Sequence, residues 1–160
     1  MKQFKSISIE DRKDMFLVVA ERLSLSEGII EKDYWVTFVL DYLFNDSPWK
    51  DNLAFKGGTS LSKCYQIINR FSEDIDLVLD WHLLGFKNLK LDVSLSQNQK
   101  NKLKRDILAK SNQFIEQEIL PKITNDFYSL IDEPFSLYLD GEETICFIYP
   151  KLFNEDSLVN

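Results

Sequence analysis

The chain has 160 residues, of which 44% are hydrophobic and 28% are charged, and its formal net charge is −7. This composition is typical of a soluble globular protein, and the length predicts a single domain, residues 1–160, with a hydrophobic core. The acidic balance argues against a general nucleic-acid coat protein. Because the sequence has neither an apolar run of about 18 residues nor a signal-peptide pattern, we expect a cytoplasmic protein without membrane contact.

The cysteine and histidine content limits the chemistry further. Cys64 and Cys146 lack the spacing of a disulfide framework or of a metal site, and we interpret both as small core residues. His82 is the only histidine, so a metal site built from several histidines is excluded. Acid–base catalysis by histidine is disfavoured for the same reason.

Two helices are predicted at the start of the chain, in a helical lead-in that covers residues 1–45. Ser8 is placed to cap the first helix, over residues 9–23. The second helix runs from about residue 27 to residue 44, where a segment of Asn, Asp, Ser and Pro ends it. The apolar stripe expected for the first helix consists of Met15, Phe16, Val18, Val19 and Leu23.

A core motif follows at residues 50–80. It begins with a short strand at about residues 53–56, which runs into a double glycine. A helix is predicted at residues 60–69 and a second strand at residues 75–79. The motif therefore predicts a strand, a tight turn, a short helix and a second strand.

The remaining half of the chain predicts helices and then a hairpin. An irregular crossing at residues 82–95 includes a short strand at about residues 90–93. The helical part, residues 96–131, has Ser96 as its cap, and Pro121 should kink or end the helix. The hairpin occupies residues 135–149, with an Asp-Gly turn. This order of elements predicts an α+β fold, in which a small mixed β-sheet is flanked by helices.

The second strand of the core motif carries two acids that should share one face. Side chains two apart on a strand point the same way, so Asp74 and Asp76 lie side by side while Ile75 turns to the buried face. Two crowded carboxylates repel each other unless a cation lies between them. Oxygen ligands with room for phosphates suit Mg²⁺. We interpret Asp74 and Asp76 as metal ligands; the alternative is a solvated acidic strand end.

The turn before the predicted helix has the composition of a phosphate site. A double glycine lets a backbone approach a phosphate closely, and the helix that follows would offer unpaired N–H groups. A capped helix after a tight turn uses the same donors, so the functional and structural interpretations are compatible. The spacing is not that of a P-loop. The residues expected to hold a nucleoside triphosphate are Lys56, Gly57, Gly58, Thr59 and Ser60.

One lysine of the motif helix is a candidate catalytic residue. Lys63 lies one turn into the predicted helix, where it would reach a γ-phosphate. A solvated lysine is the equally simple alternative.

A basic stretch interrupts the acidic sequence. Between residues 86 and 110 there are seven Lys or Arg residues against two acids. These residues form either a solvated helix face or a surface for the RNA backbone.

Three segments resemble a known family. Residues 55–61 and 70–76 resemble the nucleotidyltransferase superfamily, and in particular the AbiEii/AbiGii toxin family, which includes the MenT toxins. Residues 31–35 resemble a Glu-Lys-Asp-Tyr stretch on the helix that precedes the first strand in this family. The resemblance is strong over residues 25–80 and weak elsewhere.

The resemblance implies a fold and an activity. It implies a nucleotidyltransferase-like fold and a toxin that transfers a nucleotide from an NTP to an acceptor, with Mg²⁺, or Mn²⁺ in its place, as the metal. The implied acceptor is RNA, such as a tRNA 3′ end, and the implied protein partner is a cognate antitoxin. It also places Lys32 and Asp33 beside the nucleotide, although a Lys-Asp pair on a helix is commonly a surface pair.

Family members also use a third carboxylate on a later strand. The late acids near predicted strands are Asp132, Glu142 and Glu143, and none lies between apolar residues as a buried-strand ligand would. A second hypothesis is therefore a truncated, non-catalytic remnant that binds a nucleotide or an antitoxin. A third hypothesis, a glycosyltransferase that uses its Asp-x-Asp pair for a nucleotide sugar, is disfavoured by the double glycine and the small size.

Overall fold

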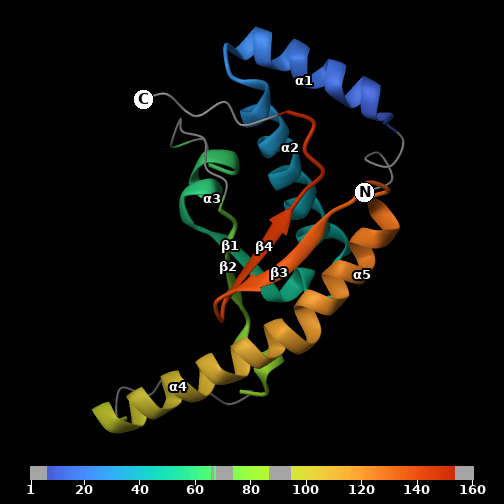
Figure 1. Ribbon diagram of the computed structural model, residues 1–160. Coiled ribbons are helices and arrows are strands. Elements are labelled where there is room, and N and C mark those ends of the chain that lie inside the picture. The colour runs from blue at the N-terminus through green and yellow to red at the C-terminus, as the bar shows by residue number, and fades with distance from the viewer. Residues whose placement is uncertain (1–6, 66, 68–73, 87–94, 154–160) are drawn as a thin grey trace. The chain divides into compact units, whose positions relative to one another are not determined.

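The computed structural model describes residues 7–65, 67, 74–86 and 95–153 (Figure 1). The chain forms two compact units. Unit 1 comprises residues 1–78 together with residues 149–160, and unit 2 comprises residues 79–148. Unit 1 is therefore discontinuous in sequence, because the chain returns to it after unit 2. The single-domain organisation stays a prediction.

Two helices open unit 1. Helix α1 spans Ile9–Leu23 and helix α2 spans Glu27–Asp41, which extends through a π-helical turn, η2, at Tyr42–Asp46. The predicted cap is confirmed, since the Ser8 hydroxyl accepts a hydrogen bond of 3.0 Å from the amide of Asp11. Both helices lie close to their predicted bounds because caps and chain breaks are local signals.

The apolar stripe expected for α1 is largely wrong. Of its five residues only Phe16 is buried, and Val18 is 65% exposed. The buried side chains are Arg12, Phe16 and Ala20, which are spaced by four residues along one narrow line of the helix. An arginine therefore occupies a position that hydrophobicity alone assigns to solvent.

The core motif contains two strands and a short helix. A 3₁₀ turn, η3, at Lys50–Asn52 leads into strand β1, Leu53–Lys56, at the predicted position. Helix α3 spans Gly57–Lys63, and strand β2 spans Asp76–Leu79 and pairs with β1. The expected start of the helix at residue 60 is wrong by three residues. The low helix propensity of glycine argues for the later start. In the structure, the hydrogen bonds that Thr59 and Ser60 make with Asp74 and Phe55 stabilise the first turn of the helix.

Some predictions for this region lie outside the described residues. These are the predicted end of the motif helix at residue 69 and the short strand at residues 90–93. Cys64 follows α3 and is exposed, so its assignment to the core is wrong; Cys146 is half-buried on β4, Thr144–Ile148. No helix of the described residues has the length and apolarity that a membrane span requires.

Aromatic side chains form the core of unit 1. The segment Tyr149–Phe153, which we call the return segment, packs on α1 and α2 in this core. The rings of Trp35 and Tyr149 stack with centroids 5.7 Å apart and an interplanar angle of 23°. The rings of Phe16 and Phe153 are 6.3 Å apart. These ring contacts thus hold the return segment, which is remote in sequence, against the two N-terminal helices of unit 1.

Unit 2 is built from a bent helical run. A 3₁₀ turn, η4, spans Trp81–Leu84, and α4 spans Gln97–Phe114, with the predicted cap Ser96 extended to a capping box with Gln99. A π-helical turn, η5, at Ile115–Ile119 joins α4 to α5, Leu120–Leu130. The run bends at this junction (Figure 1). Pro121 lies just after this π-helical turn, and a proline inside a continuous helical run bends the helix because it has no N–H group to donate.

A hairpin completes unit 2, as predicted. Strand β3, Ser136–Asp140, pairs antiparallel with β4, Thr144–Ile148. Gly141 in the turn has φ +73°, a backbone conformation that glycine adopts without strain. The described strands thus form two two-stranded sheets among helices, and the predicted α+β class is confirmed.

Phe127 is the main contact between α5 and the hairpin. It is 1% exposed, and its ring centroid lies 5.4 Å from that of Phe147 and 6.2 Å from that of Phe135. We expect Phe127→Ala to lower the free energy of unfolding of unit 2 by about 3–5 kcal/mol, because it leaves a cavity at the centre of this contact. Chemical denaturation measures the effect.

The neighbouring residue provides a control for this substitution. Tyr128 is 68% exposed, and its ring is tilted by 46° against the ring of Phe135, with centroids 4.8 Å apart. Tyr128→Ala should therefore cost about 1 kcal/mol. Equal losses in the two variants would contradict the packing described for Phe127.

Candidate functional site

Gly57 and Asp76 are in close contact, and this contact joins the two halves of the core motif. Gly57 is the first residue of α3 and has φ +76°. A Cβ atom built at this position would overlap Oδ2 of Asp76 and lie 2.8 Å from its Cγ. Both the backbone conformation and the space therefore require glycine here. Gly57 and Asp76 are 19 positions apart in the sequence, and they can come this close because Gly57 has no side chain.

Asp74 and Asp76 alternate with half-buried residues, as expected for a strand with one face toward solvent. Both aspartates are exposed, while Ile75 and Leu77 are half-buried. Within the described residues neither carboxylate takes part in an ion pair. Two exposed carboxylates beside a glycine-lined turn fit a hard cation such as Mg²⁺, which retains several waters and shares phosphate oxygens.

The hydroxyls of Thr59 and Ser60 face the protein. Both side chains are buried. The Thr59 hydroxyl donates a 2.5 Å hydrogen bond to the carbonyl of Asp74, and the Ser60 hydroxyl lies 3.4 Å from the carbonyl of Phe55. These two bonds tie α3 to β1 and to the chain two residues before β2. Their side chains thus hold the motif together, which leaves backbone groups to contact a ligand in the turn.

Lys63 forms an ion pair with Asp33, which the family resemblance places beside the nucleotide. Its Nζ lies 2.6 Å from Oδ1 of Asp33 and 3.3 Å from the hydroxyl of Thr37, both on α2. The Lys63 side chain is 23% exposed and that of Asp33 is 45% exposed. The structure thus brings Lys63 and Asp33 together. Lys32 is half-buried on α2, and Lys56 is exposed at the end of β1.

Glu31 is a buried carboxylate that the site prediction did not include. It is 1% exposed and is the first residue of the Glu-Lys-Asp-Tyr stretch on α2. Its Oε1 accepts a 2.7 Å hydrogen bond from the amide of Leu152, and its Oε2 accepts one of 3.0 Å from the amide of Phe153. In the sequence Glu31 is followed by Lys32 and Asp33, so no pattern of hydrophobicity distinguishes it from a solvated charge.

Burial changes the acidity of Glu31. Desolvation raises the pKa of its carboxyl above the ordinary value of 4.5, against the amides of Leu152 and Phe153 and the charges of Arg12 and Lys151, which lower it. Because the folded protein then binds this proton more tightly than the unfolded chain, the contribution of Glu31 to stability falls as pH rises above 4.5.

No third carboxylate joins the pair in the part of the chain that the structure describes. No group of three or more His, Cys, Asp or Glu residues there could hold a metal ion. Glu142 accepts a 2.7 Å hydrogen bond from Asn112, and Asp132 is exposed after α5. Glu143 lies in the exposed hairpin turn. These three acids belong to unit 2, whereas Asp74 and Asp76 belong to unit 1.

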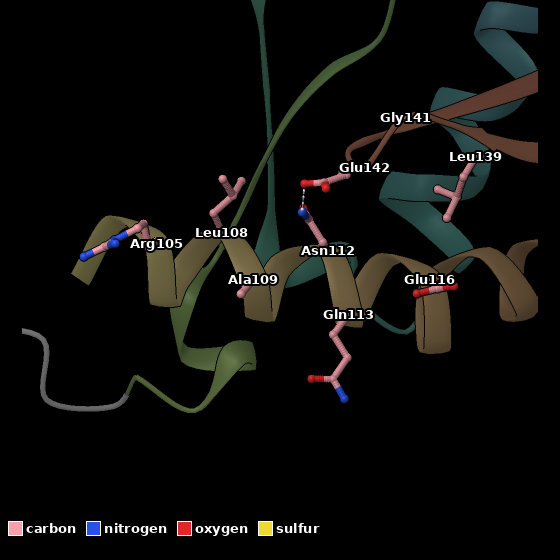
Figure 2. Close-up of a pocket in the computed structure, with 9 residues that line it drawn as sticks. All are labelled: Arg105, Leu108, Ala109, Asn112, Gln113, Glu116, Leu139, Gly141 and Glu142. Atoms are coloured by element: carbon pink, nitrogen blue, oxygen red, sulfur yellow. Dashed lines mark hydrogen bonds between the residues drawn. The ribbon is translucent and has the colours of Figure 1, made fainter. Parts of the chain in front are cut away.

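Unit 2 has an open groove of about 530 Å³ between α4 and the tip of the hairpin. Figure 2 shows Asn112 and Glu142 bonded across it, with Arg105 and Glu116 along the same helical run. Of the basic stretch, Lys110 is used internally: its Nζ lies 3.3 Å from the carbonyl of Leu84 and 4.5 Å from the ring of Phe86. The remaining basic residues on α4 are exposed; these are Lys100, Lys102, Lys104 and Arg105.

Gly57→Ala tests the contact between the turn and Asp76. We expect a loss of stability of about 2–4 kcal/mol, because a Cβ atom would collide with the Asp76 carboxylate in addition to straining the backbone. Gly141→Ala is the matched control, since Gly141 has φ +73° with open space around a Cβ atom. It should cost about 1–2 kcal/mol from backbone strain alone. Thermal or chemical unfolding measures both, and equal losses would show that the contact with Asp76 is unimportant.

A double-mutant cycle tests the pair formed by Lys63 and Asp33. We expect Lys63→Met and Asp33→Asn to couple by about 0.5–1 kcal/mol in the free energy of unfolding, a modest value because water screens partly exposed charges. The coupling should shrink at about 1 M salt. Strictly additive effects at low salt would mean that α3 is not held to α2 by this ion pair.

Comparison with known proteins assigns the chain to a family. Residues 39–143, about two-thirds of the chain, match the family described as nucleotidyl transferase AbiEii toxin, type IV toxin–antitoxin system. The match includes β1, α3 and β2, whereas α1, Glu31 and Asp33 lie outside it. No curated protein and no solved structure matches the chain. The chain belongs to the AbiEii nucleotidyl transferase toxin family.

Proposed function

We propose that the protein transfers a nucleotide from a nucleoside triphosphate to an acceptor hydroxyl in a magnesium-dependent reaction. The observation that carries this proposal is the exposure of Asp74 and Asp76, together with the contact of the Asp76 carboxylate with the glycine turn at Gly57. In the reaction, an acceptor oxygen forms a bond to the α-phosphorus and the bond to the β-phosphate oxygen breaks. Pyrophosphate leaves, and the proton of the acceptor hydroxyl passes to water.

Asp74 and Asp76 would hold the metal ion, Mg²⁺ or Mn²⁺. When bound, such an ion offsets triphosphate charge and polarises phosphoryl oxygens. The backbone at Gly57 and Gly58 would approach the phosphates, because glycine adds no side chain of its own to the turn. The Asp76 carboxylate, which lies against Gly57, would place the metal ion next to this backbone. Thr59 and Ser60 support the site indirectly, through the hydrogen bonds that tie α3 to the backbone of Asp74 and to β1.

The lysines have separate roles in this proposal. Lys56 is exposed where β1 enters the turn, so its ammonium group is available to a phosphate. Lys63 lies farther along α3, and its pairing with Asp33 anchors the helix and sets the orientation of the ammonium group. We assign Lys63 to charge balance at the triphosphate, with Asp33 as its orienting partner. Lys32 would add positive charge on the neighbouring helix.

The acceptor in this proposal is RNA, such as the 3′ end of a tRNA. The exposed basic residues of α4 supply the positive charge that a phosphate backbone requires, on a chain whose net charge is −7. Membership in a toxin–antitoxin family supports a cognate antitoxin as the protein partner. We place the reaction in the cytoplasm, where NTPs and tRNA are available.

One observation favours a second candidate function. Within the described residues no third acid accompanies Asp74 and Asp76. A protein that keeps the glycine turn and the carboxylate pair without a third ligand would bind a nucleotide or an antitoxin without catalysing transfer.

The discriminating experiment uses isosteric substitutions. The protein is incubated with each labelled NTP, Mg²⁺ and total tRNA, and label transfer is measured for the wild type, Asp74→Asn and Asp76→Asn. We expect each variant to lose at least about 10²-fold in transfer, because removal of a carboxylate weakens the metal site. Asp51→Asn, an exposed acid in η3, is the control and should retain activity.

The outcomes separate the two candidates. Magnesium-dependent NTP binding without transfer would favour the non-catalytic binding protein. Transfer that survives in both variants would contradict the assignment of the metal ligands.

A further inference from the structure

We propose that Glu31 is a positioning residue for the candidate site: its buried carboxylate anchors the return segment, Tyr149–Phe153, and thereby fixes the rotation of α2 that turns Asp33 toward Lys63. The structural part of this inference concerns unit 1 alone. Its consequence for nucleotide binding rests on the proposed function.

Glu31 binds two successive backbone amides. The Leu152 and Phe153 amides donate to different oxygens of the same carboxylate, at 2.7 Å and 3.0 Å. Successive N–H groups that converge in this way form an anion-binding concavity, and here the anion is supplied by the chain itself. Hydrogen bonds to a charged acceptor are about twice as strong as neutral ones, so this contact gives the return segment a defined position.

The surroundings of Glu31 connect three parts of unit 1. Arg12 of α1 is 4% exposed, its charge acts on Glu31, and its guanidinium carbon lies 5.5 Å from the centroid of the Trp35 ring. Trp35 in turn stacks on Tyr149 of the return segment. The charges that face Glu31 are thus Arg12 from α1 and Lys151 from the return segment. The Glu31 carboxylate of α2 thus interacts with a charge on α1 and with a charge and two amides of the return segment.

The helix geometry transmits this anchor to the other face of α2. Side chains two residues apart on an α-helix are separated by about 200°. With Glu31 turned into the core, Asp33 must turn away from it, and on that face it meets Nζ of Lys63 at 2.6 Å. Thr37 lies one turn after Asp33 and also contacts Nζ of Lys63, at 3.3 Å. A single rotation of α2 thus allows both the contacts of Glu31 with the return segment and the contact of Asp33 with Lys63.

A carboxylate is a costly choice for this position. An apolar side chain of similar volume would avoid the desolvation that raises the pKa of Glu31. Apolar packing is non-directional, however, and would not distinguish between neighbouring rotations of the helix. The two amide bonds supply that direction.

Glu31→Gln tests the inference, with Glu21→Gln, an exposed glutamate on α1, as the matched control. The glutamine keeps the volume but places an NH₂ group against one of the two amides. Hydrogen exchange is measured for the amides of Leu152 and Phe153 and for α3, and the Kd of each NTP with Mg²⁺ is measured by titration. We expect exchange to rise by about tenfold or more in both regions and Kd to rise several-fold, while the control matches the wild type.

Separate outcomes overturn the inference and the proposed function. Faster exchange at Leu152 and Phe153 with unchanged exchange in α3 would show a local clamp and overturn the positioning role. Unchanged exchange in both regions would overturn the anchor itself. If the wild type binds no NTP, the proposed function fails, whereas the exchange data still decide whether Glu31 fixes α2.

A second variant covers the case in which Glu31→Gln does not fold. Leu152→Pro removes the donor of the 2.7 Å bond and leaves Glu31 intact. Its exchange in α3 should rise in the same way. Exchange in α3 equal to that of the wild type would again overturn the positioning role.

Discussion

The close approach of Gly57 to Asp76 is the constraint on which the candidate site depends. A turn that carried any side chain would push away the carboxylate, and the strand that bears it would lose its place beside β1. The hydroxyls of Thr59 and Ser60 reinforce the same arrangement from the buried side. Thr59 and Ser60 therefore stabilise the motif from inside, whereas Asp74 and Asp76 are exposed to solvent.

Helix α2 forms a second layer of support around this motif. One face meets Lys63 of α3, and the other carries Glu31 into the aromatic core beside the return segment. The buried carboxylate opposes folding where it is ionised, as its raised pKa indicates. Ring packing of Trp35 on Tyr149 and of Phe16 on Phe153 offsets that cost. Stability and orientation thus come from different interactions in the same cluster.

The family assignment and the structure support each other at different positions. The family match spans the glycine turn and both aspartates, to which we assign the phosphates and the metal ion. The contacts of Glu31 and Asp33 lie outside the matched range and are known from tertiary structure alone. Unit 2 adds a helix with exposed basic residues and an open groove beside a hairpin.

The sequence by itself determined the caps at Ser8 and Ser96, strand β1 and the hairpin, because these features depend on residues close together in the chain. It also determined the family, through the spacing of the glycines and aspartates. Only the tertiary structure decided that α3 begins at Gly57, that Arg12 and Glu31 are buried, and that Lys63 pairs with Asp33. These contacts join residues up to 122 positions apart, and no local pattern of hydrophobicity or propensity specifies them.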